Sequence, residues 1–207
     1  MDDYAAFSPL SPTTLADCVS GEQVMDFGIR PLWADMPRLV GPAFPVRCAP
    51  GDNLMLHAAI YRAPPGSVIV VAAGDTKFAV AGGNVCAVAQ RRGIAGFVVD
   101  GVIRDLAEVR TRRFPVFARG VSPIPGQKNA VDIFNGHVRC GGVDVAPHDV
   151  IVADEEGIVV VPVATRADVL ARAHARAAKD ATETLDAWEL AHHARINDIL
   201  RQRNFHM

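Results

Sequence analysis

The segment from Ser67 to Asp100 limits the possible folds more than any other part of the chain. It begins with SVIVVAA, a mainly β-branched run that is typical of a buried strand. A helix is predicted between Gly82 and Gly93, with Asn84 as its N-cap, and the apolar strand Ile94 to Asp100 follows directly. So compact a strand, helix, strand order predicts a βαβ unit with parallel neighbouring strands. We therefore expect an α/β fold.

The flanking sequence predicts one α/β domain over residues 1–163 and a helical extension over residues 164–207. Three further helices are expected: one capped by Ser11 or Thr13, one starting at Asp52, and a short one from Asp105 to Arg112. Short strands are predicted at residues 137–140, 143–145, 149–153 and 158–161. The extension is predicted to be one long helix through Arg203 with little or no break, and its apolar stripe leads us to expect packing on a neighbouring subunit.

Composition excludes several classes of function. Half of the 207 residues are apolar, which is enough for a hydrophobic core. The formal net charge is -2 and the basic residues are dispersed, so we expect no binding to nucleic acid. No apolar run is long enough to span a membrane, and the chain starts with acidic residues where a signal peptide would be basic. We expect a cytoplasmic protein.

The cysteines and histidines do not predict a zinc site. Cys18, Cys48, Cys86 and Cys140 form no CxxC pair, and we expect them to be buried free thiols. The histidines include no HExxH spacing.

Two short motifs follow consecutive strands of the βαβ unit. Gly82-Gly83 opens the predicted helix, whose N-terminal residues Asn84 and Val85 present unpaired backbone N–H groups to an anion. Arg104-Asp105 follows the next strand, after a turn expected at Gly101. An arginine can bind a carboxylate bidentately, and an aspartate can hold a divalent cation.

Neither motif is specific alone, because a glycine pair before a helix is usually a turn, and an Arg-Asp pair is most often a cap plus a solvated charge. Their order along the chain favours a shared binding site, because the segments that follow parallel strands emerge at one edge of the sheet. Asp100 either joins that site or bonds the turn at Gly101.

A longer set of motifs, in order and with these spacings, carries a family resemblance over roughly residues 12 to 180. The set resembles the family that contains 4-hydroxy-4-methyl-2-oxoglutarate aldolase, 4-carboxy-4-hydroxy-2-oxoadipate aldolase and the RraA-like proteins. Its members here are Gly74-Asp75, Gly82-Gly83, Gly93-Ile94-Ala95-Gly96, Val99-Asp100-Gly101, Arg104-Asp105, Pro115-Val116-Phe117-Ala118, Gly141-Gly142-Val143 and Ala153-Asp154 to Pro162.

The resemblance implies a central mixed β-layer flanked by helices, similar to the swivelling phosphohistidine domain. It also implies homotrimers or homohexamers with active sites at subunit interfaces. By the same resemblance, Gly82, Gly83, Asn84 and Val85 form the loop that binds the substrate carboxylate through backbone amides. Arg104 is the substrate-binding and catalytic arginine, and Asp105 is the catalytic protein ligand of Mg2+ or Mn2+.

These roles suit cleavage of a 4-hydroxy-2-oxo acid to pyruvate, with oxaloacetate decarboxylation as a side activity. Cleavage leaves a pyruvate enolate, whose charge a divalent cation and Arg104 can stabilise. The Schiff-base route would need a desolvated lysine, and the chain has only Lys77, Lys128 and Lys179.

The general base and the branch of the family stay open. Many relatives carry Asp or Glu where this chain has Gly83, which leaves a metal-bound water, Asp100 or a residue of another subunit as candidates. Asp180 and Glu183 match a borrowed C-terminal acid too loosely to be assigned. The alternative function is a non-catalytic RraA-type regulator that binds a ribonuclease, a branch in which the residue after the arginine tends not to be a carboxylate.

Overall fold

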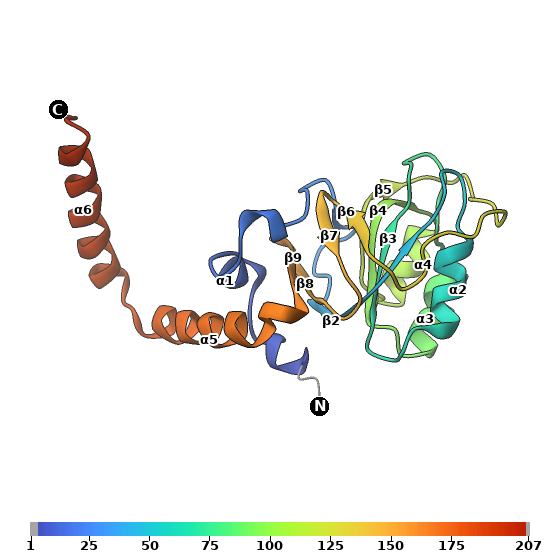
Figure 1. Cartoon of the computed structure of the whole chain (residues 1–207), viewed down its shortest axis with the longest axis horizontal. Helices are drawn as coiled ribbons and strands as arrows, with labels where there is room; N and C mark the ends of the chain where they lie inside the picture. The colour runs from blue at the N-terminus through green and yellow to red at the C-terminus, as the bar shows by residue number, and fades with distance from the viewer. Residues whose placement is uncertain (1–3, 206–207) are drawn as a thin grey trace. The chain divides into compact units, whose positions relative to one another are not determined.

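The computed structural model describes residues 4–205, and Figure 1 shows how its elements are arranged. The strands are β1 (Arg30–Pro31), β2 (Leu39–Arg47), β3 (Val68–Ala72), β4 (Gly96–Ile103), β5 (Val116–Val121), β6 (Val138–Cys140), β7 (Val143–Val145), β8 (Val150–Asp154) and β9 (Gly157–Val161). The α-helices are α1 (Pro12–Ala16), α2 (Leu54–Arg62), α3 (Gly83–Arg91), α4 (Leu106–Thr111), α5 (Arg166–Thr182) and α6 (Leu185–Gln202), and short 3-10 helices lie at Tyr4–Phe7, Gly21–Gln23 and Val163–Thr165.

A seven-stranded mixed sheet in the order β1-β5-β4-β3-β2-β8-β9 organises the fold. Strands β2, β3, β4 and β5 are parallel neighbours, whereas β1, β8 and β9 pair antiparallel. The predicted βαβ unit is β3-α3-β4, with Ile69 opposite Phe97 and Val70 opposite Val98. The expected α/β fold with a central mixed sheet is confirmed.

Helices cover one face of the sheet, and the β6-β7 hairpin covers the other (Figure 1). Alternate side chains of a strand point to opposite faces, so each central strand contributes to two cores. Toward α2, α3 and α4 the strands bury Phe44, Val46, Ile69, Val71, Phe97, Val99, Val116 and Ala118. Toward the hairpin they bury Val68, Val70, Val98 and Phe117. The four cysteines are buried and free, as expected.

Two local predictions are wrong. Gly82, not Asn84, is the N-cap of α3, and Asn84 lies in the first turn of that helix. The expected turn at Gly101 is also absent, because β4 continues to Ile103 with a shift in its register to β5 between Val99 and Val102. A Cβ at Gly101 would lie 2.5 Å from the Cβ of Ala73, so this glycine allows close strand packing and not a turn.

The C-terminal region is helical, as expected, but it consists of α5 and α6 and not of one continuous helix. Thr184 separates them: its backbone is extended, and its hydroxyl accepts a hydrogen bond from the Ala187 amide. The chain divides into two compact units, residues 1–173 and 174–207. No helix in the described part of the chain is long and apolar enough to cross a membrane.

Candidate functional site

A small pocket of about 150 Å³ collects most of the residues that the sequence singled out. Gly82, Asn84, Val85, Arg104 and Asp105 all line it, and Gly83 adjoins it through its backbone N–H. The other lining residues are Asn53, His57, Ala79, Val80, Ala81, Glu108, Pro125, Gly126 and Lys128.

Backbone pairing brings the two motifs together. The chain before α3 runs beside the end of β4, where the Val80 amide donates to the Val102 carbonyl at 3.0 Å. Further along, the Arg104 amide donates to the Ala81 carbonyl at 2.9 Å. The start of α3 and the Arg104-Asp105 pair therefore meet at the carboxyl edge of the parallel strands, as predicted.

Asp105 turns its carboxylate toward α3 instead of capping its own helix. It is the N-cap residue of α4, but it adopts the left-handed conformation, with φ of 56°, and makes no side-chain cap bond. Its Oδ2 accepts from the Gly83 amide at 3.1 Å and lies 3.4 Å from Arg104 Nε. The side chains of Arg104 and Asp105 are 43% and 39% exposed, so solvent or a ligand reaches both.

Gly82 leaves the space that these two side chains occupy. A Cβ there would lie 2.5 Å from Asp105 Oδ2 and 2.9 Å from Arg104 Cγ. Gly83 is equally restricted, because a Cβ on it would collide with the carboxylate of Glu108. Glu108, in the first turn of α4, thus places a carboxylate at the point where a side chain at position 83 would project.

The N-terminus of α3 has amides available for an anion. In the first turn of a helix the N–H groups have no intrahelical acceptor. Gly83 uses its amide on Asp105, whereas the amides of Asn84 and Val85 have no backbone acceptor in the described part of the chain. Asn84, Val85 and Arg104 all line the same pocket, and backbone amides together with a guanidinium suit a small carboxylate.

The donor set fits a cation bound through one protein carboxylate. Within residues 4–205 there is no group of three His, Cys, Asp or Glu side chains that could enclose a metal. Asp105 still offers Oδ1, which makes no hydrogen bond or ion pair with the described residues. Mg2+ suits such a site because it keeps several of its waters.

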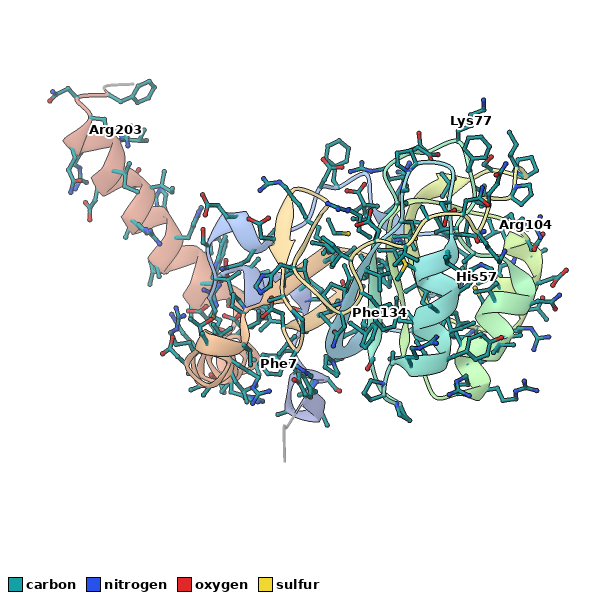
Figure 2. All side chains as sticks on the ribbon, turned by 45° about the vertical axis from the view of Figure 1, so that its right-hand side comes forward. Phe7, His57, Lys77, Arg104, Phe134 and Arg203 are labelled. Atoms are coloured by element: carbon teal, nitrogen blue, oxygen red, sulfur yellow. The ribbon has the colours of Figure 1, made fainter. Side chains whose placement is uncertain are left out.

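Asn53, His57, Glu108 and Lys128 also line the pocket, although no sequence motif marks them as site residues. Asn53 is the N-cap residue of α2 and is 4% exposed, and its amide nitrogen donates to the Gly126 carbonyl at 3.1 Å. His57 lies one turn further along α2, and Figure 2 labels it together with Arg104. The spacing of Asn53 and His57, which puts them on one helix face, was the only signal of this pair in the sequence. Lys128 comes from a loop without any motif.

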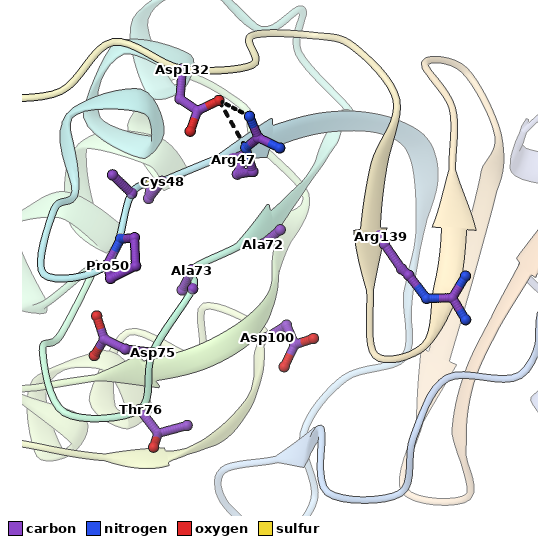
Figure 3. Close-up of a pocket in the computed structure, with 12 residues that line it drawn as sticks. Arg47, Cys48, Pro50, Ala72, Ala73, Asp75, Thr76, Asp100, Asp132 and Arg139 are labelled. Atoms are coloured by element: carbon purple, nitrogen blue, oxygen red, sulfur yellow. Dashed lines mark hydrogen bonds and ion pairs between the residues drawn. The ribbon is translucent and has the colours of Figure 1, made fainter.

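Asp100 lies in a different cavity (Figure 3) and is not a base candidate for the small pocket. Its carboxylate forms an ion pair with Arg119 and accepts from the Gly141 amide at 2.8 Å. The cavity beside it measures about 590 Å³ and is also lined by Arg47, Asp132 and Arg139. The predicted bond to the turn at Gly101 is wrong as well, since Asp100 bonds to the loop between β6 and β7.

Comparisons with known proteins agree with one another on the family. Residues 12–160 match the RraA-like model, described as Aldolase/RraA. A protein of Halalkalibacterium halodurans named "Putative 4-hydroxy-4-methyl-2-oxoglutarate aldolase" is 39% identical over 181 residues, which cover 87% of this chain and 86% of that protein. The matched range 12–160 spans every residue that lines the small pocket.

Solved structures give the same fold. An unusual member of the RNase ES inhibitor RraA protein family from Streptomyces coelicolor is 27% identical, with a TM-score of 0.75 over 86% of this chain and 92% of that one. The RNA-processing inhibitor RraA from Thermus thermophilis is 26% identical, with a TM-score of 0.66 over 72% of this chain and 91% of that one.

Proposed function

The chain belongs to the RraA-like family, and on that premise we propose that it is a divalent-metal-dependent, class II aldolase. Its substrates are 4-hydroxy-2-oxo acids such as 4-hydroxy-4-methyl-2-oxoglutarate or 4-carboxy-4-hydroxy-2-oxoadipate, which it cleaves to pyruvate. One observation carries the proposal: Arg104, Asp105 and the N-terminus of α3 converge on one pocket. The relative from Halalkalibacterium halodurans supports it by name.

Binding begins with the substrate carboxylate. The amides of Asn84 and Val85 donate to it at the positive end of the α3 dipole. Arg104 lines the same pocket and adds a fixed positive charge there. Oδ2 of Asp105 accepts a hydrogen bond from the Gly83 amide, which holds the carboxylate in place while Oδ1 stays available for the cation.

Cleavage between C3 and C4 moves an electron pair toward the 2-oxo oxygen and forms a pyruvate enolate. Mg2+ or Mn2+ bound at Asp105 supplies the Lewis acid for that developing charge. Arg104 stabilises the same charge, and removing one such preorganised group typically costs about 2.7–4 kcal/mol of transition-state stabilisation. Loss of CO2 from oxaloacetate gives the same enolate, so we propose oxaloacetate decarboxylation as a second activity of this site.

The test is pyruvate release from 4-hydroxy-4-methyl-2-oxoglutarate with added Mg2+, coupled to lactate dehydrogenase. Asp105→Ala and treatment of the wild type with EDTA should each abolish it. Asp144→Ala is the matched control, because this exposed aspartate lies on β7 and outside the pocket. Undiminished turnover after either treatment would refute the metal role of Asp105.

A regulator that binds a ribonuclease is the second candidate. Two structurally similar proteins carry names that describe RNA-processing or RNase inhibition, and this is the observation that favours it. Co-purification of the chain with an endoribonuclease, together with no pyruvate release under added Mg2+, would replace the aldolase proposal with this one.

We further propose a homotrimer or homohexamer in which the C-terminal helices pack on a neighbouring subunit. None of the described side chains of α6 is buried, although Leu185, Trp188, Leu190, Ile196 and Ile199 are large and apolar. Light scattering gives the number of subunits for the full chain and for a chain that ends at residue 183. The same number of subunits in both would contradict the proposed packing of the C-terminal helices.

A further inference from the structure

Two residues that line the small pocket each carry a buried polar atom with no hydrogen-bond partner in the described part of the chain. These atoms are Oδ1 of Asn53 and Nε2 of His57. Asn53 is only 4% exposed, and its side-chain nitrogen already donates a hydrogen bond to the Gly126 carbonyl. An unpaired buried polar atom is costly, so a water molecule or a ligand must supply the missing partners of these two atoms.

Both atoms are acceptors. An interaction with the Val80 backbone acts to raise the pKa of His57. The Val80 amide already donates to Val102, so the Val80 carbonyl is the group available to the ring. We therefore assign the ring proton to Nδ1, because Nε2 is the buried ring atom without a partner. His57 Nε2 then carries the lone pair, and Asn53 Oδ1 can only accept.

Two acceptors on residues that line one pocket call for a donor on the ligand. The cations Arg104 and Lys128 line the same pocket and suit the carboxylates of a dianionic substrate, but they leave these two acceptors unmatched. A 4-hydroxy-2-oxo acid has one donor, its C4 hydroxyl. We propose that His57 is the general base that removes the proton from this hydroxyl, and that Asn53 is a positioning residue that holds it; this rests on the proposed aldolase function.

The substrate and His57 together supply every proton and electron that the cleavage needs. The C4 hydroxyl gives its proton to His57 Nε2, the O–H electron pair becomes the second bond of the new C4 carbonyl, and the C3–C4 bond breaks. Its electrons form the enolate of pyruvate. The enolate takes up one proton at C3, and His57 returns one proton, so no oxidant or co-reactant is needed.

The surroundings of His57 keep its imidazole neutral and able to accept a proton. Burial lowers its pKa below the ordinary value of 6.5, and the positive charges of Lys128 and Arg104 act in the same direction. The hydrogen bond to Val80 and the negative charge of Asp52 oppose this shift without cancelling it. A neutral ring at pH 7 fits a general base.

The experiment separates this role from the function on which it rests. Retro-aldol cleavage requires removal of a hydroxyl proton, whereas oxaloacetate decarboxylation does not. In His57→Gln we expect kcat/KM for 4-hydroxy-4-methyl-2-oxoglutarate to fall about 100-fold or more. Decarboxylation of oxaloacetate should change much less, and calorimetry should give a wild-type Kd for oxalate, a planar analogue of the enolate, with Mg2+ present.

Two further measurements guard against a variant that only misfolds. His57→Ala leaves space in the pocket, so added imidazole should restore part of its cleavage activity. The wild type should lose kcat/KM for cleavage as the pH falls below an apparent pKa under 6.5, and this acid limb should vanish in His57→Gln. His137→Gln is the control, because this histidine is exposed and outside the pocket.

The outcomes are distinct. A wild type that releases no pyruvate from either substrate overturns the proposed function, and the role of His57 with it. An active wild type whose His57→Gln variant still cleaves the hydroxy acid overturns only the role of His57. Equal loss of both reactions, with loss of oxalate binding, would make His57 structural.

Discussion

Substitution of Gly82 by alanine tests whether the pocket geometry determines activity. The added Cβ would lie 2.5 Å from Asp105 Oδ2, 2.9 Å from Arg104 Cγ and 3.1 Å from Arg104 Nε. Non-bonded carbon atoms settle at about 3.5–4.0 Å, so both side chains must retreat by roughly 1 Å. Both belong to the proposed catalytic machinery, and one methyl group therefore displaces two of its charged groups.

The expected loss of activity is large and the expected loss of stability is small. A misplacement of about 1 Å in an active site can lower the rate about 100-fold. That factor corresponds to about 2.7 kcal/mol in the activation free energy. Gly82 has φ of -158° and ψ of -171°, an extended conformation that alanine adopts without strain, and the atoms it would meet belong to flexible side chains. A destabilisation of about 1 kcal/mol would lower Tm by about 2–4 °C.

The assay is the coupled measurement of pyruvate release with Mg2+, together with a thermal melt of each variant. Gly21→Ala is the matched control, because a Cβ on Gly21 meets no atom within 4 Å. A Gly82→Ala variant with wild-type kcat/KM would refute the reasoning, since the reacting groups would then lie elsewhere. A variant that unfolds would show that Gly82 matters for the fold and not for the placement of Arg104 and Asp105.

Two other predictions concern carboxylates outside the pocket. Asp100→Asn should leave pyruvate release unchanged but lower the free energy of unfolding by about 1–3 kcal/mol in a urea titration, because its bonds to Arg119 and Gly141 involve a charged acceptor; a loss of activity in the folded variant would contradict its structural role. Burial acts to raise the pKa of Asp52 and of Asp75, but hydrogen bonds from backbone amides outweigh it and hold both pKa values below 3.8. Their contribution to stability is therefore complete above about pH 4 and is lost as the pH falls through the folded-state pKa values, so the urea midpoint should drop between pH 4 and pH 3, whereas an unchanged midpoint would refute the assignment.

Part of the site could be predicted because it depends on local order along the chain. Two buried strands joined by a short helix favour a parallel crossover connection. The carboxyl ends of parallel strands then lie at one edge of the sheet. The start of α3 and the Arg104-Asp105 pair then had to emerge together. Their meeting in one pocket is what the structure shows.

The rest of the pocket depends on contacts between segments that are distant in the sequence. Asn53 and His57 come from α2 and Lys128 from a loop, and only the packing of α2 against that loop joins them to Arg104. Asp100 was expected either to join the site or to bond the turn at Gly101. Neither is correct, because its carboxylate pairs with Arg119 of β5 and accepts from Gly141 between β6 and β7. Periodicity and caps carry no information about such pairings.

The sequence by itself determined the α/β class, the parallel βαβ unit and the edge of the sheet where the two motifs gather, because each of these depends on patterns within about 35 residues. Only the tertiary structure decided that Asp105 lines the pocket, that Asp100 stabilises the fold, and which acceptors lack a partner. The physical reason is that burial and hydrogen bonding are properties of the packed surroundings of a side chain. Asp100 and Asp105 are the same residue type five positions apart, and their environments alone separate their roles.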